Sequence, residues 1–366
     1  MPLRRTFVAL AGLLALTSSG LCFSQTTLVL RDLSTVETRQ LSFDQEKVAT
    51  AEGKTYGWDQ VLQTKLQNGS RQQQFERYVR ESGLPLFQMR HRLSTQDYLS
   101  LGEVVEPLLS ALAAEKLNES NSRRHYLIHL AAFRNDLATG HRADALLSFL
   151  ELCRIHKRFP AASKDFAAFD LSPDELEQGF TIHLLPIFFD QEAAVRVSSQ
   201  IKNNTIRGLG NANIGKQLYV VALLIAAGET DSAKTKLRQL SSRSSKLVLR
   251  WRPQFRVQLE IAERQNGAAT SQLKREYKSL RGPERALSNY LIAKQSLQRQ
   301  EDYDLAILEL LYIPANHDNL PNLSAAALHE AARISRLAGH NQEADTIRGQ
   351  LLNRYPATYH GRNIDR

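Results

Sequence analysis

The sequence predicts a mostly α-helical protein in which stacked α-α hairpins form a superhelix behind a small antiparallel β module. Three observations predict this fold class. From about residue 67 onward, apolar residues recur at the spacing of amphipathic helices. Junctions at which a glycine precedes an alanine by five residues recur between amphipathic segments. Residues 26–66 instead alternate short β-prone runs with turn residues.

The composition is that of a chain that buries a core. Of the 366 residues, 42% are hydrophobic and 23% are charged, which is typical of globular proteins and not of disordered ones. The net charge of +9 permits association with acidic polymers but does not require it. Cys153 is the one cysteine outside the first 24 residues, so the fold has no predicted internal disulfide. Its place in a helical apolar stripe predicts a buried thiol.

Residues 1–24 have the three-part layout of a secretory signal peptide. Arg4 and Arg5 precede the apolar run Phe7–Leu16, which is shorter than the roughly 20 residues that span a bilayer. We expect cleavage after Ser24 and export to the periplasm or beyond; a retained short anchor is one alternative. Lipidation of Cys22 is the other, and the leucine before it disfavours that. Removing both arginines lowers the net charge from +9 to +7, and no later run predicts a transmembrane segment.

Residues 25–66 form the predicted β module. Thr27–Leu30 is a β-prone run, and turn residues such as Asp32–Ser34 and Glu52–Lys54 separate it from further short runs. We expect Phe43 and Trp58 to supply the core of a small antiparallel sheet. The arrangement resembles small β-barrel modules of the SH3-like or Sm-like kind, which implies binding of a peptide or nucleic acid. A structural cap on the helical body is an equally acceptable interpretation.

Residues 67–210 form a predicted helical domain, and residues 211–366 form a predicted repeat domain. Ser172–Glu175 is a capping box with proline at the first helical position, so a helix begins there. Leu209–Asn213 is the expected break between the two blocks. In the later block the junctions lie at Gly228, Gly267, Glu301 and Gly339, at intervals of 39, 34 and 38 residues, and Gly140 marks an earlier copy.

The physical basis of these junctions is specific. Each glycine ends a helix in the left-handed conformation, and the small alanine five residues later lets the returning helix pack closely. Ala145, Ala233, Ala306 and Ala344 occupy those positions. A single hairpin leaves one apolar face uncovered, which the next hairpin buries, so the hairpins should stack.

Residues 213–358 resemble the tetratricopeptide family of helix-turn-helix repeats. The best match is Leu337–Ala344, the second is Gly228–Ala233, and Tyr355-Pro356 falls near the place of the family's repeat-ending proline. The resemblance implies a superhelix with a concave groove that grips a peptide or a partner protein. The spacing is irregular and the aromatic position of each first helix is mostly missing, so we expect an imperfect superhelix.

A basic run interleaved with aromatic residues is the predicted partner-binding surface. It comprises Arg250, Trp251, Arg252, Phe255 and Arg256, preceded by Arg238, Arg243 and Lys246. Arginines can contact anionic groups while aromatic rings contact flat ones. We expect Pro253 to kink or interrupt any helix there. A solvated repeat face is the simpler alternative, and binding of an anionic polymer is another.

One catalytic alternative comes from another class. Glu81-Ser82 resembles the catalytic Glu-Ser of lytic transglycosylases, which implies a cell-wall glycan-cleaving enzyme with Glu81 as its general acid. That family's following glycine-containing motif is absent, because Gly83 leads into Leu84-Pro85. The simpler interpretation is an ordinary helix end, with Gly83 as the cap and Pro85 starting a new element.

The other motifs predict no cofactor. Gly210–Lys216 matches most of a phosphate-binding loop, but Gln217 stands where Ser or Thr would hold Mg²⁺, so no nucleotide is expected. His125 and His129 have the spacing of two metal ligands without an evident third. The sequence therefore predicts an exported, non-catalytic scaffold that binds a protein or peptide partner.

Overall fold

The computed structural model describes residues 26–166, 169, 171–203, 209–241, 245–265, 267–298 and 303–364. The predicted signal peptide, with its cleavage site at Ser24 and the alternative lipidation site at Cys22, lies outside these residues. The chain forms two compact units, Met1–Phe87 and Gln88–Arg366, each with its own core. Within the described ranges, no helix is long and apolar enough to cross a membrane.

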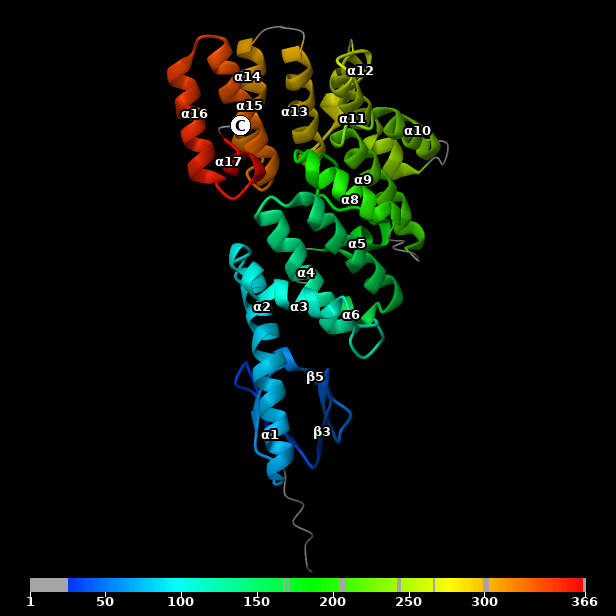
Figure 1. The fold of residues 1–366 in the computed structure, drawn as a ribbon, viewed down its shortest axis with the longest axis vertical. Helices are drawn as coiled ribbons and strands as arrows, with labels where there is room; N and C mark the ends of the chain where they lie inside the picture. The colour runs from blue at the N-terminus through cyan, green and yellow to red at the C-terminus, as the bar shows by residue number, and fades with distance from the viewer. Residues whose placement is uncertain are drawn as a thin grey trace, which may run out of the picture. The chain divides into compact units, whose positions relative to one another are not determined.

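The first unit holds two small antiparallel sheets within residues 26–64 (Figure 1). The strands are β1 (Thr26–Leu30), β2 (Thr35–Thr38), β3 (Leu41–Phe43), β4 (Lys47–Thr50), β5 (Thr55–Gly57) and β6 (Val61–Thr64), with a 3-10 turn η1 (Trp58–Gln60) before the last. The strand orders are β2-β1-β6 and β3-β4-β5. In the first sheet, Leu28 pairs with Val36 on one side and Thr64 on the other.

The core of this unit is aromatic, as predicted. Helix α1 (Gly69–Tyr78) inserts Phe75 against the two predicted core residues, with ring centroids 5.4 Å from Phe43 and 5.3 Å from Trp58. The indole Nε1 of buried Trp58 donates to the carbonyl oxygen of Asp44 at 3.0 Å, which satisfies its one polar group.

The helix does not end at Gly83, contrary to the simpler interpretation of the Glu81 region. A π-helical turn η2 (Val79–Gly83) joins α1 to α2 (Leu84–Ser94), and Leu84 N donates to Val79 O. This wider turn accommodates Pro85, which lacks an N–H and would clash in a regular α-helix. Gly83 is required for packing, because a Cβ there would lie 2.9 Å from Trp58 O.

The second unit consists of helices packed on one another, which confirms the predicted mostly α fold class behind a small β module (Figure 1). Its elements are η3 (Leu99–Leu101), α3 (Gly102–Leu112), α4 (Ser122–Ala138), α5 (Arg142–Arg158), α6 (Ala161–Lys164), α7 (Pro173–Gln178), α8 (Gln191–Asn203), η5 (Gly210–Ala212), α9 (Asn213–Ala226), α10 (Thr230–Ser241), α11 (Lys246–Ala262), α12 (Ala268–Glu276), η6 (Tyr277–Ser279), α13 (Gly282–Gln298), α14 (Tyr303–Asn316), α15 (Pro321–Leu337), α16 (Asn341–Arg354) and α17 (Tyr359–Arg362). Antiparallel pairs pack as α4 with α5, α9 with α10, α11 with α12, α13 with α14, and α15 with α16. Successive pairs then pack through α9, α11, α13 and α15.

The predicted glycine junctions are present at three positions. Gly140, Gly228 and Gly339 have φ values of 75°, 82° and 87°. The four alanines that follow the junctions, Ala145, Ala233, Ala306 and Ala344, are all buried. Gly267 differs from the prediction: its φ is −69°, and Arg264 takes the left-handed conformation at the end of α11 with φ 53°. Glu301 lies outside the described residues.

The stack also bends back on its own beginning. Asn322 Nδ2, at the start of α15, donates to Leu137 O near the end of α4 at 3.0 Å. A Cβ on Gly140, in the turn between α4 and α5, would lie 2.6 Å from the backbone nitrogen of Tyr359 in α17. The last hairpin therefore contacts the turn of the α4/α5 hairpin, which an open superhelix would leave far apart.

Candidate functional site

The structure corrects the predicted basic-aromatic surface on α11. Trp251 is 1% exposed and Phe255 is 0% exposed, so both aromatic rings are core residues. Trp251 packs on Phe180, with ring centroids 5.1 Å apart. The helical spacing of Val248, Trp251, Phe255 and Leu259, all buried, is the sequence signal that identifies this inner stripe.

The arginines of that surface remain outside the core. Arg250 is exposed and forms an ion pair with Glu284 of α13, while Arg252 and Arg256 are half-buried. Pro253 lies inside α11, which continues through it, contrary to the predicted interruption. The surface therefore consists of guanidinium groups without the interleaved aromatic rings.

The inner faces of the hairpins are occupied by the chain itself. An extended segment between α7 and α8, residues 180–190, here called the inner segment, runs across α9 and α11. The buried Tyr219 hydroxyl of α9 accepts from Thr181 N at 3.1 Å and donates to Leu184 O at 2.8 Å. Gln258 Nε2 of α11 donates to Pro186 O at 3.1 Å.

The same segment also reaches α5, α13 and α17. Arg142 Nη2 of α5 donates to Leu185 O at 2.7 Å. Phe189 packs edge-on against Tyr290 of α13 and His360 of α17, with centroids 6.0 and 4.9 Å apart. The face on which the tetratricopeptide resemblance placed a peptide groove is thus filled by residues 180–190, and an external peptide cannot lie there in this structure.

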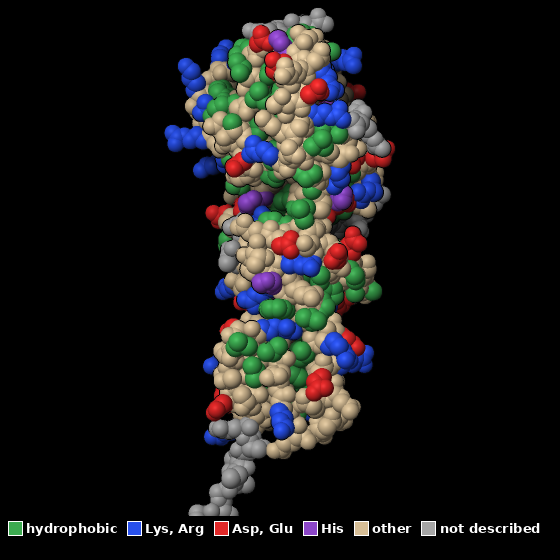
Figure 2. All heavy atoms as spheres, turned by 90° about the vertical axis from the view of Figure 1, so that its left-hand side faces the viewer, with side chains coloured by type: hydrophobic (Ala, Val, Ile, Leu, Met, Phe, Trp, Pro, Cys, Tyr) green, Lys and Arg blue, Asp and Glu red, His purple; other side chains and the backbone are tan. Residues whose placement is uncertain are grey.

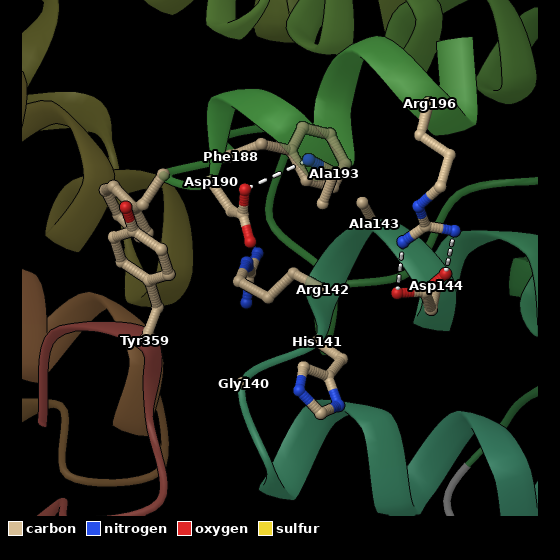
Figure 3. A pocket seen from close by; sticks show the side chains of 11 residues that line it. Gly140, His141, Arg142, Ala143, Asp144, Phe188, Asp190, Ala193, Arg196 and Tyr359 are labelled. Carbon is tan, nitrogen blue, oxygen red and sulfur yellow. Dashed lines mark hydrogen bonds and ion pairs between the residues drawn. The ribbon is translucent and has the colours of Figure 1, made fainter. Parts of the chain in front are cut away.

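A polar pocket of about 240 Å³ lies where the inner segment meets the α4/α5 turn (Figure 3). Figure 3 shows Arg142 directed towards Asp190, with Arg196 of α8 paired to Asp144 on the other side. Both Arg196–Asp144 contacts measure 2.8 Å, and Asp190 Oδ1 accepts from Ala193 N at 3.0 Å. Burial lowers the pKa of Arg142 to about 10. The polar groups that line the pocket pair within the chain. We therefore interpret the pocket as a junction that holds α5, the inner segment and α8 together.

The carboxyl group of Asp136 interacts electrostatically with the pocket residue Asp144, and its pKa is raised. Burial is the largest cause and the nearby Asp144 carboxylate the second, and together they raise the pKa of Asp136 to about 7. The side chain therefore titrates near neutral pH instead of in the acid range.

The aromatic face of the β module is likewise covered by the chain. Tyr78 of α1 lies over Trp58, with ring centroids 5.3 Å apart, and Arg71 places its guanidinium 5.2 Å from the ring of Phe43. Arg71 Nη2 also donates to Leu41 O at 2.7 Å. Helix α1 thus covers the rings of Phe43 and Trp58.

Glu81 has surroundings unlike those of a glycosidase general acid. Its side chain is 52% exposed and forms an ion pair with Arg77, one turn away on the same helix, at 2.9 Å. A general acid of this kind needs burial to hold its proton at neutral pH. The geometry gives Glu81 no such environment.

The remaining motifs serve packing. The segment Gly210–Lys216, which matches part of a phosphate-binding loop, follows helix α8 instead of a strand, and a Cβ on Gly215 would lie 2.1 Å from Gly179 O. Burial lowers the pKa of His129 to about 3, while His125 lies 3.3 Å from Glu115. Cys153 is buried as predicted. Among the described residues, no group of three or more His, Cys, Asp or Glu side chains is arranged to hold a metal ion.

An apolar groove between α14 and α16 went unnoticed in the sequence. Its volume is about 720 Å³, and it is lined by Asp304, Ile307, Leu308, Leu311, Ser335, His340, Gln342, Glu343, Thr346 and Ile347. Leu308 is 65% exposed at its edge, and Leu305 and Leu337 are also exposed. Figure 2 shows hydrophobic side chains exposed among charged ones on the face to which α16 belongs. The signal was the run 305–313, in which Glu309 is the single charged residue.

Comparison with known proteins identifies no family for this chain. No protein-family model, no curated protein and no solved structure matches the chain. What is established is a helical body and a β module of two sheets.

Proposed function

We propose that this chain is an exported, non-catalytic scaffold, and that it binds a basic amphipathic helix of a partner protein in the groove between α14 and α16. The observation that carries the proposal is the apolar ridge of α14 that faces solvent. Full burial of a leucine side chain is worth about 2 kcal/mol, so a helix with several exposed leucines gains stability when a partner covers them.

The shape of the ridge suits a helix. Leu305, Leu308 and Tyr312 are exposed at i, i+3 and i+7 on α14, and so form one stripe. The opposite stripe, Ala306 and Leu310, is buried within the unit. The groove beside the ridge can receive the apolar side of an amphipathic helix, a recurring mode of peptide recognition.

The charges at the groove favour a basic partner. Asp304 and Glu343 line it and are exposed, and Asp304 lies 3.5 Å from His340. These carboxylates stand out on a chain with a net charge of +9. Lysine or arginine residues flanking the partner's apolar stripe would contact them.

The same proposal includes the finer fold relationships and the export. We assign residues 213–358 to tetratricopeptide-like repeats, which the buried junction alanines and the stacked hairpins support. The adjacency of first and last strands, β1 with β6, supports an SH3-like or Sm-like module at residues 25–66. The charged start and apolar run of residues 1–24 support export with cleavage near Ser24.

The test uses a labelled amphipathic peptide with leucines at i, i+3, i+4 and i+7 and lysines elsewhere. Fluorescence anisotropy should show binding to the protein and loss of binding with Leu308→Asp. Leu249→Asp is the matched control, because Leu249 is a 54% exposed leucine on α11, away from the groove. A glutamate version of the peptide should bind more weakly.

Equal binding by the two leucine variants, or by the two peptides, refutes the proposal. A second copy of the chain is the competing occupant of the groove. Sedimentation equilibrium distinguishes it, because self-association that Leu308→Asp abolishes would replace the peptide interpretation.

A second function, binding of an anionic polymer, is favoured by one observation on α11. Arg250 is paired with Glu284, but no ion pair is formed by Arg252 or Arg256 with any described residue. Two free guanidinium groups on one helix attract phosphate or sulfate chains, and such binding weakens steeply with salt. Retention on heparin should fall when both are replaced by glutamate, and unchanged retention contradicts this function.

A further inference from the structure

A polar pocket with an excess of positive charge lies at the C-terminal ends of α11 and α13. Its volume is about 640 Å³, and its polar lining consists of Arg264, Lys294 and Arg333 together with Gln265, Gln295 and Gln298. Of the described residues that line it, none is acidic. The three cations form a set of charged hydrogen-bond donors that suits an anion.

The neighbouring carboxylate of Glu330 neutralises only part of this positive charge. The carboxylate of Glu330 in α15 forms ion pairs with both Lys294 Nζ, at 3.2 Å, and Arg333 Nη2, at 2.9 Å. Arg264 forms no ion pair with any carboxylate of the described chain. Counted over the described residues alone, one negative charge faces three positive ones, an excess of two positive charges.

The backbone conformation of Arg264 also distinguishes this helix end from the others. At the ends of α4, α9 and α15 the left-handed position belongs to Gly140, Gly228 and Gly339, whereas α11 has Arg264 there with φ 53°. A side chain at such a position costs about 1 kcal/mol relative to glycine. Arg264 thus lies beside the pocket at the position where the other three helix ends have a glycine.

An apolar cavity of about 130 Å³ shares the lining residue Lys294 with the polar pocket. It lies between α9, α11, α13 and the inner segment, and its lining includes Phe188, Phe189, Ile225, Ile261 and Leu291. Along α11, Ile261 leads into Arg264, and along α13, Leu291 leads into Lys294. Lys294 lines both spaces and so connects the apolar cavity with the cationic pocket.

We propose that this site binds a small amphiphilic anion, whose carboxylate or phosphate head contacts Lys294, Arg264 and Arg333 and whose short apolar chain enters the cavity beside Phe188 and Phe189. The glutamines Gln295 and Gln298 are already committed to the backbone, with Nε2 atoms 2.9 Å from Gln265 O and Ile261 O. Specificity therefore comes from charge and apolar contact. Tyr290 and Glu330 raise the pKa of Lys294, so the ammonium stays charged at any physiological pH.

Isothermal titration calorimetry on the full chain without residues 1–24 tests this site. The probes are hexanoate, hexyl phosphate, hexylamine and inorganic phosphate. Hexanoate or hexyl phosphate should bind, and comparison of the two identifies the preferred head group. Hexylamine should not bind, because the cationic pocket repels its ammonium group.

Arg264→Gln is the decisive variant, because it removes a cation that no described carboxylate needs. Affinity for the bound anion should fall about tenfold, the effect of one charge-assisted hydrogen bond. Arg275→Gln is the matched control and should leave affinity unchanged, because Arg275 is an exposed arginine on α12 that does not line the pocket. Loss of binding in Arg333→Gln would add support, provided that its melting temperature is retained.

Three results overturn the proposal. The first is equal binding of hexylamine and hexanoate. The second is equal affinity of the Arg264→Gln and Arg275→Gln variants. The third is binding of inorganic phosphate as tight as that of hexyl phosphate, which would show that the apolar cavity takes no part.

Discussion

The hydroxyl group of Tyr219 provides the sharpest test of the inner segment. Tyr219→Phe removes one oxygen atom and leaves the ring in its stack with Phe180, whose centroid lies 5.1 Å away. No packing volume is lost elsewhere, so the change isolates the polar contacts between α9 and residues 180–190. The variant leaves Thr181 N without its acceptor and Leu184 O without its donor.

The magnitude follows from burial. Tyr219, Thr181 and Leu184 are each 0% exposed, so water cannot replace the lost partner. Each buried backbone group left unsatisfied costs about 1–3 kcal/mol. For the two groups together, we expect the free energy of unfolding of the second unit to fall by about 2–6 kcal/mol.

Urea denaturation followed by circular dichroism measures that loss, and hydrogen-exchange mass spectrometry locates it in residues 180–190. Tyr312→Phe is the matched control, because Tyr312 is an exposed tyrosine on α14 and its replacement should cost almost nothing. A loss in Tyr219→Phe as small as in the control, with unchanged exchange of residues 180–190, would show that the inner segment is not held by α9.

Two further predictions concern the α4/α5 turn. Gly140→Ala should destabilise the second unit well beyond Gly339→Ala, because a Cβ at Gly140 would lie 2.6 Å from Tyr359 N. A Cβ at Gly339 would meet open space, so that variant carries only the left-handed strain of about 1 kcal/mol. Equal melting temperatures of the two variants would contradict the contact at Gly140. Asp136→Asn should stabilise the protein above pH 7 but not at pH 4, because a folded-state pKa of about 7 exceeds the ordinary 3.8, so stability is lost as pH rises from 4 through 7. The gain has an upper limit of about 4 kcal/mol, and a gain equal at both pH values excludes this titration as its cause.

The hairpin junctions show how much of the fold was predictable. Gly228, Gly339 and the alanines after them carry local information, because a left-handed helix end and a close helix crossing each depend on one small side chain. Gly267 was misassigned since the same backbone conformation can be adopted, at a cost, by Arg264. Helix continuity through Pro253 and Pro85 was also missed, because packing and a π-helical turn compensate what proline disrupts locally.

The candidate binding sites were harder to predict from the sequence than the fold was. Arg250, Trp251 and Phe255 are close in sequence, but a helix directs them to different sides, and burial of the rings removes them from any surface. The groove between α14 and α16 and the cationic pocket at Lys294 combine residues that lie tens of positions apart. Such combinations depend on which hairpins are neighbours.

The sequence by itself determined the β module, the helical hairpins and the positions of most junctions, because periodicity, turn residues and small side chains act over short distances along the chain. The tertiary structure alone decided which faces are free. It placed residues 180–190 across the inner faces of α9 and α11, closed the last hairpin onto the α4/α5 turn, and left the apolar ridge of α14 in solvent. The physical reason is that exposure results from competition among all segments for the same apolar faces.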